Sequence, residues 1–441
     1  MTHYVIIGAS IAGTSAAEAI RERDTAAAIS IVSEERHGLY SRPGLAYLLR
    51  GDIPEKQLAA RTPEDVRQLR ATTLHARAEQ LRPAQHQVVL STRQTLTYDR
   101  LLLATGSLAV PPEFPGAQLR GVLKLDHLED ARALLKASGR NKTAVVIGGG
   151  ITALELVEGL RARGMTVYYF MRGDRYWANV LDETESRLVE DRLRDEGVII
   201  YTRTQIKQAL GKREKLIGVE TLTGETLKCA VLAAAIGVKP RLELAHTANL
   251  RLDRGLLVDE YLRTSAPDVY AAGDVAQVYD SRSGRAVLDV LWSTAQAQGR
   301  AAGFNMAGAA QPYVKRVAMN VTQLAGLVTT IIGAVGGGHD EDLLTISRGD
   351  SEAWRLPTGA WVLTDQQAVN RLRVLVSDRA IVGALVIGDQ AWSQPLYQLI
   401  AAEADIRPIR AQLEADSTLA LTQLSNFYQR WEPTHRASTN V

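Results

Sequence analysis

The stretch YVIIGASIAG at residues 4–13 decides the fold of this chain. Residues 4–7 form a short apolar, β-branched run that ends at Gly8, and an alanine-rich helical pattern follows over residues 13–23. Residues 29–32 predict the next strand. A strand, a glycine turn, a helix and a second strand within about thirty residues are typical of a βαβ unit that binds a dinucleotide.

The glycines of this turn follow the dinucleotide fingerprint, with a serine in the middle position. Gly8 allows the tight turn, Gly13 lets the helix pack close to the sheet, and the small Ser10 offers a hydroxyl to phosphate. The helix N-terminus presents free N–H groups to a pyrophosphate, and Glu35 follows the second strand, where a carboxylate accepts from ribose. The candidate residues of this site are Gly8, Ser10, Ile11, Ala12, Gly13 and Glu35.

The same pattern returns in the middle of the chain. Residues 143–147 predict a strand, residues 148–150 a turn of three glycines, residues 153–164 a helix and residues 166–170 a second strand. The candidate residues of this second site are Gly148, Gly150 and Ile151. Two such units in one chain indicate dinucleotide binding more strongly than either unit alone.

The second unit lacks the acidic residue that binds ribose. Met171 stands at that position, and Arg172 and Arg175 follow it. Because an arginine pairs with a 2′-phosphate, this pattern favours NADPH over NADH as the exchanging nucleotide. The alternative is a pair of solvated arginines on a loop.

The composition is that of a globular chain. Its 441 residues predict about three domains, and a net charge of +2 gives no general attraction to nucleic acid. No apolar stretch of about 18 residues predicts a transmembrane helix, and no signal peptide is expected at the N-terminus. The single cysteine, Cys229, stands in an apolar context, so we expect a reduced, buried thiol in a cytoplasmic protein. A redox-active cysteine pair within the chain is excluded.

Four further segments carry a resemblance to a known family. Residues 98–107 contain Ala104, Thr105 and Gly106, residues 235–240 contain Gly237, residues 264–274 end in Gly273 and Asp274, and residues 292–308 contain Trp292 and Ala295. In this order, over residues 3–310, the chain resembles the flavoprotein reductases of the pyridine nucleotide-disulfide oxidoreductase superfamily. Asp274 follows an apolar strand and a glycine, which places it at the carboxyl edge of the first sheet.

The resemblance implies an α/β fold with two Rossmann-like dinucleotide-binding domains of three layers each and a C-terminal α+β interface domain. FAD is expected in residues 1–112 with 240–308, NADPH or NADH in residues 113–239, and a dimer contact in residues 309–441. It further implies that Asp274 binds the ribityl chain of FAD and that the helix containing Trp292 and Ala295 lies beneath the flavin ring. A homodimer is expected on the same ground.

Residues 39–45 indicate a branch of the superfamily. With Arg42 and Pro43 they resemble the ferredoxin and rubredoxin reductases and the NAD(P)H-oxidising part of nitrite reductases. Relatives that reduce disulfides carry a cysteine nearby, where this chain has Ser41. Electrons are therefore expected to leave FAD directly for an outside acceptor.

Some electron-transfer relatives pair a lysine near this segment with a glutamate on the second helix. Glu155 matches the glutamate, but only Arg50 stands near the lysine position. Arg42 is a possible substitute cation or a ligand of the FAD phosphates. Glu155 and Arg42 are thus the candidate catalytic residues, and the alternative for Glu155 is a helix residue stabilised by the macrodipole.

Two features of the last 130 residues have plain explanations. Residues 336–342 contain three glycines, His339 and three acids, which we interpret as a solvated turn; no metal site is expected. Apolar residues fall on one face of a final helix, which favours packing on this chain or on a dimer partner over attachment to a membrane surface. They are Leu419, Leu421, Leu424, Phe427, Tyr428 and Trp431.

The leading hypothesis is an FAD-dependent NAD(P)H oxidoreductase whose acceptor is a small ferredoxin- or rubredoxin-like protein. A reductase of quinones or small molecules is the first alternative, because Ala295-Gln-Ala-Gln298 partly resembles an element of quinone-reducing relatives. A flavin-bound redox sensor is the second alternative, because Met171 replaces the expected acid and the lysine is missing.

Overall fold

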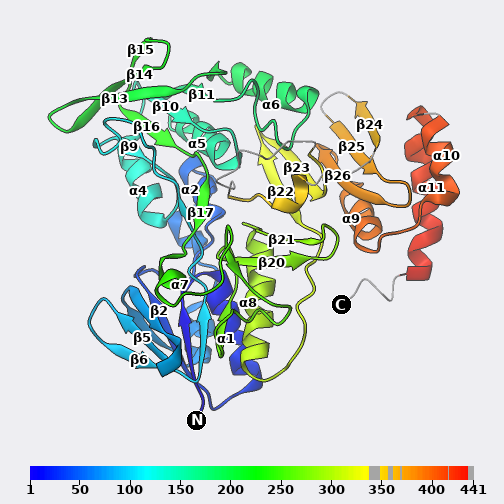
Figure 1. The fold of residues 1–441 in the computed structure, drawn as a ribbon. Helices are drawn as coiled ribbons and strands as arrows, with labels where there is room; N and C mark the ends of the chain where they lie inside the picture. The colour runs from blue at the N-terminus through cyan, green and yellow to red at the C-terminus, as the bar shows by residue number, and fades with distance from the viewer. Residues whose placement is uncertain (337–347, 356–360, 368–369, 416, 436–441) are drawn as a thin grey trace. The chain divides into compact units, whose positions relative to one another are not determined.

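The computed structural model describes residues 1–336, 348–355, 361–367, 370–415 and 417–435 (Figure 1). The chain divides into two compact units. The first comprises Met1–Arg172, Arg203–Lys315 and Leu344–Ser351, and the second comprises Gly173–Thr202, Arg316–Leu343 and Glu352–Val441. No helix of the described residues is long and apolar enough to cross a membrane.

The first unit contains a parallel sheet built on the N-terminal strand. Its order is β19-β7-β1-β2-β3, with β19 at Val269–Ala271, β7 at Arg100–Leu103, β1 at His3–Ile7, β2 at Ala28–Ser33 and β3 at Thr72–His75. The register pairs Ile7 with Val32 on one side and with Leu103 on the other. The inner strands are almost wholly apolar because a parallel sheet is buried on both faces.

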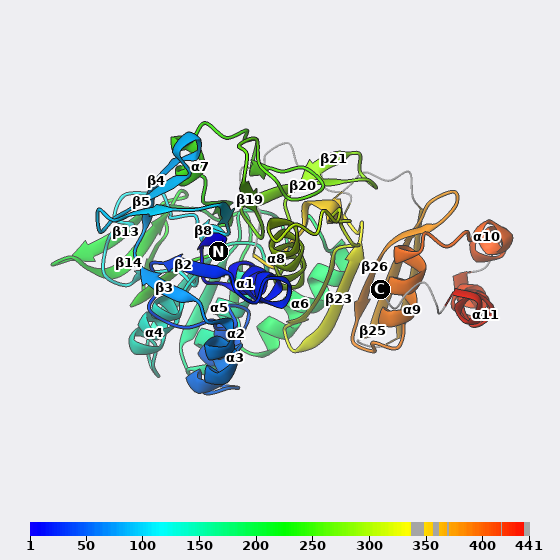
Figure 2. The ribbon, with the colours of Figure 1, turned by 90° about the horizontal axis from the view of Figure 1, so that it is seen from below.

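Helices α1 (Ile11–Arg23) and α8 (Trp292–Met306) pack side by side against this sheet (Figures 1 and 2). An antiparallel sheet of β4 (Ala78–Arg82), β5 (Gln87–Leu90) and β6 (Thr95–Thr97) contributes to the same core. The smaller elements here are α3 (Pro63–Leu69), α7 (Glu243–Thr247), η1 (Glu55–Leu58), η2 (Pro83–Gln85), β18 (Leu256–Leu257), β20 (Ala276–Asp280) and β21 (Arg285–Val287).

A second parallel sheet in the same unit repeats the design. Its strands within the first unit run in the order β11-β10-β16-β9, at Thr166–Phe170, Thr143–Ile147, Val231–Ala234 and Val122–Leu123. Helices α4 (Leu128–Ala137) and α5 (Ile151–Ala162) belong to it, and α2 (Gly44–Arg50) packs against α5. An antiparallel sheet of β13 (Ile206–Lys212), β14 (Lys215–Thr221) and β15 (Thr226–Lys228) follows.

The two parallel sheets are connected by a pair of antiparallel strands, β8 (Ser107–Ala109) and β17 (Val238–Pro240). The chain leaves the first sheet through β8 and returns through β17, so the pairing of Ser107 with Pro240 holds both crossings together. The expectation of two Rossmann-like folds is confirmed. The predicted division into three domains with ends at residues 112, 239 and 308 stays a prediction.

The second unit contains an antiparallel sheet in the order β22-β23-β26-β25-β24, which confirms the expected α+β region. Its elements are α6 (Glu183–Asp195), β12 (Ile199–Tyr201), β22 (Met319–Leu324), β23 (Leu327–Gly333), η3 (Glu352–Arg355), β24 (Trp361–Gln367), β25 (Asn370–Val376), β26 (Ile381–Ile387), α9 (Ser393–Ala401), α10 (Arg407–Ala415) and α11 (Ser417–His435). Two arginines of β25 fix α6 within this unit, because Arg371 pairs with Asp182 at 2.5 Å and Arg373 with Glu185 at 2.8 Å.

The final helix packs on its own chain, as predicted. Leu424 is buried in the core of the second unit, and Leu421, Phe427, Tyr428 and Trp431 lie against that core. The side chain of Leu419 and residues 337–342 of the predicted solvated turn lie outside the described residues.

Candidate functional site

The first glycine turn admits no side chain at its two outer positions. Gly8 has a φ of +119°, and a Cβ on it would lie 2.1 Å from the carbonyl oxygen of Ala104. A Cβ on Gly13 would lie 1.9 Å from the carbonyl oxygen of Gly8. The turn therefore packs backbone against backbone with the turn that follows β7. Ser10 is the N-cap of α1, and its hydroxyl makes no capping hydrogen bond among the described residues.

Glu35 forms an ion pair that the sequence did not predict. The Tyr40 hydroxyl donates to Glu35 Oε2 at 2.6 Å, and the Arg42 guanidinium donates to the other carboxylate oxygen. Burial opposes ionisation of Glu35, but the charge of Arg42 and the Tyr40 hydrogen bond outweigh it and lower its pKa. Arg42 Nη1 also donates to the backbone carbonyl of Asp126 at 2.7 Å. Arg42 therefore connects Glu35 to Asp126, which lies 84 positions after Arg42 in the chain.

Asp126 is the centre of a charged network, and sequence reasoning missed it. Its side chain is fully buried and pairs with Arg348, while Lys124 Nζ lies 3.5 Å away and Arg42 Nη1 lies 3.8 Å away. The backbone N–H of Ala109 donates to it at 3.1 Å. Although burial opposes it, His127, Arg348 and Lys124 hold the pKa of Asp126 far below its ordinary value.

Asp126, His127 and Asp130 bring three possible metal-ligand atoms within 4.8 Å of one another. Lys124 Nζ already lies 2.7 Å from Asp130, and the backbone N–H groups of Asp126 and His127 both donate to Asp130 at 3.0 Å. Because Arg348 occupies Asp126 as well, we interpret these three residues as part of an ion-pair network rather than as a metal site.

Asp274 belongs to the later of the two chain segments expected to bind FAD, and it contacts the earlier segment through Ser107. The Ser107 hydroxyl donates to Asp274 Oδ2 at 2.6 Å, and the preceding Gly273 donates its N–H to the Gln298 side chain at 2.8 Å. Burial raises the pKa of Asp274, although Arg348, the Ser107 hydrogen bond and Arg42 oppose the rise. A carboxyl group at the carboxyl edge of the first sheet is thus fixed between two motifs.

The turn that contains Ala104, Thr105 and Gly106 lies against Arg241, which directly follows β17. Thr105 Oγ1 donates to the carbonyl of Arg241 at 3.1 Å, and the Gly106 carbonyl accepts from the Arg241 N–H at 2.9 Å. Gly106 has a φ of +70°, which favours glycine. The structure therefore brings the three residues next to the chain crossing at β17.

Two glycines of α8 explain its close approach to α1. A Cβ on Gly299 would lie 2.2 Å from the carbonyl oxygen of Ala12, and one on Gly303 would lie 2.4 Å from that of Ala16. With the buried Ala295, they form a row of small residues spaced by four, and this spacing is visible in the sequence. Trp292, at the start of α8, is partly buried against the same core.

The second glycine turn has the same geometry as the first. Gly148 has a φ of +144°, and a Cβ on it would lie 2.2 Å from the carbonyl oxygen of Ala235. A Cβ on Gly149 would meet nothing within 4 Å, and Gly150 is the N-cap of α5, which begins at Ile151. Gly237 has a φ of +117°, and its carbonyl accepts from the Val110 N–H at 3.0 Å.

The residues expected at the adenosine end of the second site lie in different units. In the first unit Met171 is buried, so its side chain fills the core, whereas the Arg172 side chain is exposed. In the second unit Arg175 Nη1 lies 3.2 Å from Asp174 Oδ1. Arg172 is therefore the cation of this segment for which the structure shows no ion pair among the described residues.

Glu155 lies in the first half of α5, with one charged neighbour on the same helix. Burial and the nearby Glu158 raise its pKa to about 8, although Arg348 and Arg50 oppose the rise. Arg50 pairs with Asp52 and lies 3.8 Å from Glu158. Arg50, which stands near the expected lysine position, thus lies close to Glu158, one helical turn beyond Glu155.

Cys229 is a buried thiol, as predicted. It is 6% exposed, and burial raises its pKa to about 12. A thiol with this pKa is not ionised at neutral pH and is a poor nucleophile.

Two glycine turns of the same geometry, each at the carboxyl edge of its own parallel sheet, define a protein with two dinucleotide-binding folds. The model of the pyridine nucleotide-disulphide oxidoreductase family matches residues 2–299. The chain belongs to this family, whose members are FAD-dependent NAD(P)H oxidoreductases.

Relatives and solved structures agree with this assignment. The chain is 28% identical over 423 residues to the epsilon subunit of an NADH-dependent phenylglyoxylate dehydrogenase from Aromatoleum evansii, covering 94% of this chain and 95% of that protein. It is 29% identical over 349 residues to the ferredoxin–NAD(+) reductase component of a biphenyl dioxygenase system from Paraburkholderia xenovorans, covering 79% and 84%. Its fold matches a crystal structure of a covalent putidaredoxin reductase–putidaredoxin complex with a TM-score of 0.85 at 22% identity, covering 97% and 99%.

Proposed function

We propose that this chain oxidises NAD(P)H and passes the electrons through FAD to a small ferredoxin- or rubredoxin-like protein. The observation that carries the proposal is the state of Cys229. It is the single cysteine, it is buried, and its pKa is raised, so a thiol relay is excluded and electrons leave the flavin directly. The ferredoxin reductase among the relatives supports this kind of acceptor.

The residues of the first turn fit FAD. Gly8 and Gly13 leave no room for side chains, so the backbone N–H groups at the start of α1 stay accessible to a pyrophosphate. We propose that Ser10, Ile11, Ala12 and Glu35 complete the adenosine and phosphate part of the site. The remaining proposed FAD contacts are Arg42, Pro43, Ala104, Thr105, Gly106, Gly273, Asp274, Trp292 and Ala295.

The residues of the second turn fit a nicotinamide dinucleotide. Gly148, Gly150 and Ile151 present the start of α5, and Gly237 lies in the segment Ala235–Pro240 that crosses back to the first sheet. Arg172 supports a contact with a 2′-phosphate, to which Arg175 is proposed to contribute, whereas two relatives are named for NADH or NAD(+). We therefore propose that both nucleotides reduce the flavin and that Arg172 adds affinity for NADPH.

When bound, FAD would supply an acceptor for a hydride from reduced nicotinamide and a donor of electrons singly or in pairs. The chain itself supplies orientation and charge. We propose that Glu155 holds a proton on its carboxyl group at neutral pH, where it is available to a nicotinamide amide group, and that Arg42 contributes positive charge beside Glu35 and Asp126. We also propose a cytoplasmic location, from the reduced thiol, and a homodimer, which light scattering tests.

The test is a reoxidation assay under anaerobic conditions. FAD-loaded protein is first reduced with NADH or NADPH, and the bleaching of the flavin absorption band at about 450 nm is followed. Ferredoxin, rubredoxin and a short-chain quinone are then added separately. Rapid return of the band with either iron–sulfur protein supports the proposal, whereas return with the quinone alone identifies a quinone reductase. A protein that neither nucleotide bleaches within seconds is not this enzyme.

A further inference from the structure

Helix α2 lies in the sequence between two strands of the first dinucleotide fold, the one built on β1, but it packs against the second. It comes after β2 and before β3, which are paired in the first parallel sheet. In space its main contacts are with α5 and α4, the helices of the second parallel sheet (Figures 1 and 2). A helix of seven residues therefore connects the fold proposed to bind FAD with the fold proposed to bind the nicotinamide nucleotide.

Arg163, the residue that follows α5, caps the C-terminus of α2. Its Nε donates to the carbonyl of Leu49 at 2.7 Å, and its Nη2 donates to the carbonyl of Leu48 at 2.9 Å. The last four carbonyls of an α-helix have no partner within the helix, so a cation at this end satisfies them and offsets the negative end of the helix dipole. α2 ends at Gly51, which has a φ of +99°, and a Cβ there would lie 3.2 Å from Nη2 of Arg163. One side chain of the second fold thus completes a helix whose sequence belongs to the first.

α5 approaches α2 closely because Gly159 has no side chain. A Cβ on Gly159 would lie 2.6 Å from Cγ of Leu49, which is fully buried. Gly159 lies one helical turn before Arg163, so the close contact and the cap act on the same end of α2. A shift of one helix along the other would break the two hydrogen bonds or open a cavity beside Leu49.

The chain just before α2 is also attached to both folds. Arg42 pairs with Glu35, which follows β2, and donates to the carbonyl of Asp126, which precedes α4, at 2.7 Å. The Tyr40 hydroxyl donates to Glu35 at 2.6 Å and accepts from the Leu128 N–H at 3.2 Å. The segment that contains α2 is therefore held to the second fold at both of its ends.

We propose that Arg163 is a positioning residue for hydride transfer, because its cap on α2 fixes the second dinucleotide fold on the first. The inference rests on the proposed function. Hydride transfer requires the nicotinamide almost in contact with the flavin, and a displacement of about 1 Å can lower the rate about a hundredfold. The two rings belong to different folds, so their separation depends on the connection between the folds. α2 is such a connection, and it directly follows Arg42 and Pro43, two of the proposed FAD contacts.

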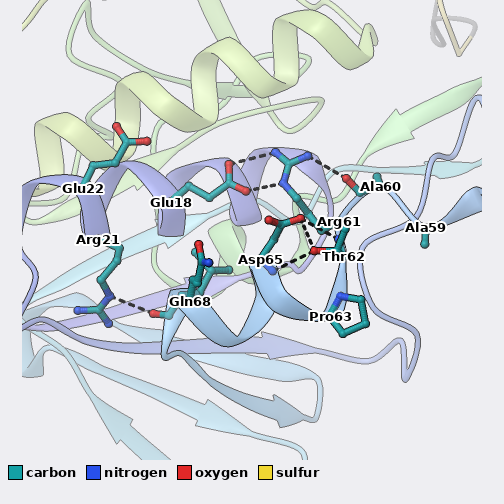
Figure 3. Close-up of a pocket in the computed structure, with 11 residues that line it drawn as sticks. Glu18, Arg21, Glu22, Ala59, Ala60, Arg61, Thr62, Pro63, Asp65 and Gln68 are labelled. Carbon is teal, nitrogen blue, oxygen red and sulfur yellow. Dashed lines mark hydrogen bonds and ion pairs between the residues drawn. The ribbon is translucent and has the colours of Figure 1, made fainter.

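The test compares three variants with a matched control. Arg163→Met keeps a long side chain but removes both hydrogen bonds, Arg163→Lys keeps a charged donor, and Gly159→Ala disturbs the helix contact while the capping residue stays. The control is Arg61→Met. Arg61 is also a partly buried arginine, and it donates to Glu18 at 2.5 Å and 3.1 Å within the first fold (Figure 3). That ion pair lines an open pocket between α1 and α3.

FAD content is measured first, and each FAD-loaded protein is then studied in three ways. Stopped-flow bleaching by NADH and by NADPH gives the limiting rate per bound FAD and the nucleotide concentration that gives half of this rate. The charge-transfer absorption beyond the flavin band reports how closely nicotinamide stacks on flavin. Amide hydrogen exchange of residues 44–52, recorded without nucleotide, reports whether the end of α2 is still capped.

For Arg163→Met we expect a limiting rate about 10- to 100-fold lower, with the half-saturating concentration within about twofold of the wild type. We also expect unchanged FAD content, a weaker charge-transfer absorption and faster exchange at the end of α2. Arg163→Lys recovers part of the rate, because its Nζ can donate to one of the two carbonyls. Gly159→Ala lowers the rate because its Cβ meets Leu49, and Arg61→Met matches the wild type.

A wild-type rate per bound FAD in Arg163→Met overturns the inference, and if that variant does not fold, a wild-type rate in Gly159→Ala overturns it. An equal loss of rate in Arg61→Met also overturns it, because the loss then follows from removing any partly buried arginine of the first unit. A wild-type protein that neither nucleotide bleaches refutes the proposed function itself. Normal bleaching of both the wild type and Arg163→Met refutes the inference alone, which separates the two failures.

Discussion

The Ser107 hydroxyl donates a hydrogen bond to Oδ2 of Asp274 at 2.6 Å and joins two motifs that are 167 residues apart. Ser107 begins β8, the strand by which the chain leaves the first sheet. Asp274 follows β19, which closes the same sheet. The bond therefore couples the geometry of the proposed FAD site to the crossing between the two dinucleotide folds.

Ser107→Ala removes this bond and is expected to weaken FAD binding about fivefold, since one hydrogen bond contributes about 1 kcal/mol. Because the bond opposes the rise in the pKa of Asp274, its loss raises that pKa further, and FAD is released at a higher pH as the solution is acidified. Ultrafiltration across a pH series measures the released flavin. Ser107→Thr keeps the hydroxyl and serves as the control; identical FAD release by Ser107→Ala and wild type contradicts the expectation.

Neighbouring glycines of the second turn are expected to respond differently to alanine. Gly148→Ala places a Cβ 2.2 Å from a backbone oxygen at a φ of +144°, so it strains the turn by about 1–3 kcal/mol before the steric contact is counted. Gly149→Ala meets no protein atom within 4 Å but narrows the approach of a pyrophosphate. We therefore expect a lower melting temperature for Gly148→Ala.

Gly149→Ala is instead expected to keep its FAD and stability and to raise the KM for the nicotinamide nucleotide. Thermal unfolding, flavin absorbance and steady-state kinetics measure the three quantities. Equal stability of the two variants would show that the Gly148 turn is not constrained as described.

The raised pKa of Glu155 predicts a pH-dependent stability. A carboxyl group whose pKa is higher in the folded state stabilises the fold below its unfolded value of about 4.5, and this stability is lost as the pH rises through about 8. Glu155→Gln removes the penalty, so its melting temperature should exceed that of the wild type increasingly from about pH 5 to pH 9. Scanning calorimetry of both proteins measures the difference.

The same group predicts an inflection near pH 8 in the rate of flavin reduction. Glu155→Gln abolishes the inflection, and Glu158→Gln moves it to lower pH because Glu158 enhances the rise in the Glu155 pKa. Stopped-flow bleaching across pH measures both effects. An unchanged inflection in Glu155→Gln assigns it to another group.

Arg172 is expected to affect NADPH more than NADH. Its side chain is exposed and forms no ion pair among the described residues. Arg172→Ala should therefore raise the KM for NADPH about five- to thirtyfold and leave the KM for NADH within about twofold. Arg36→Ala, a change of another exposed arginine, is the control. Equal changes for the two nucleotides would show that Arg172 does not recognise the 2′-phosphate.

The two dinucleotide folds could be predicted from the sequence because their signals are local. The strand, Gly8 and Gly13 lie close together in the sequence and together specify one local conformation. The structure explains why no larger residue fits at either glycine. The same reasoning applies to Gly148 in the second turn. The buried environment of Cys229 was equally readable, because its neighbours in the sequence are apolar.

The charged network could not be predicted because its members are distant in the sequence. Arg348 and Asp126 are 222 residues apart, and nothing near either residue indicates the other. Arg42 was noted as a cation, but its pairing with Glu35 depends on how the chain folds back after β2. Gly299 and Gly303 could be predicted only in part. Their spacing by four can be seen in the sequence, but their contact with α1 can be seen only in the structure.

The central claim is that two dinucleotide folds exchange a hydride with no thiol relay, and an anaerobic titration tests it most directly. FAD-loaded wild type and Cys229→Ser are titrated with NADPH or NADH while flavin bleaching is recorded. We predict complete bleaching by one equivalent of nucleotide in both proteins, because the flavin is the sole two-electron acceptor. A requirement for two equivalents, or the absence of bleaching, would contradict the account.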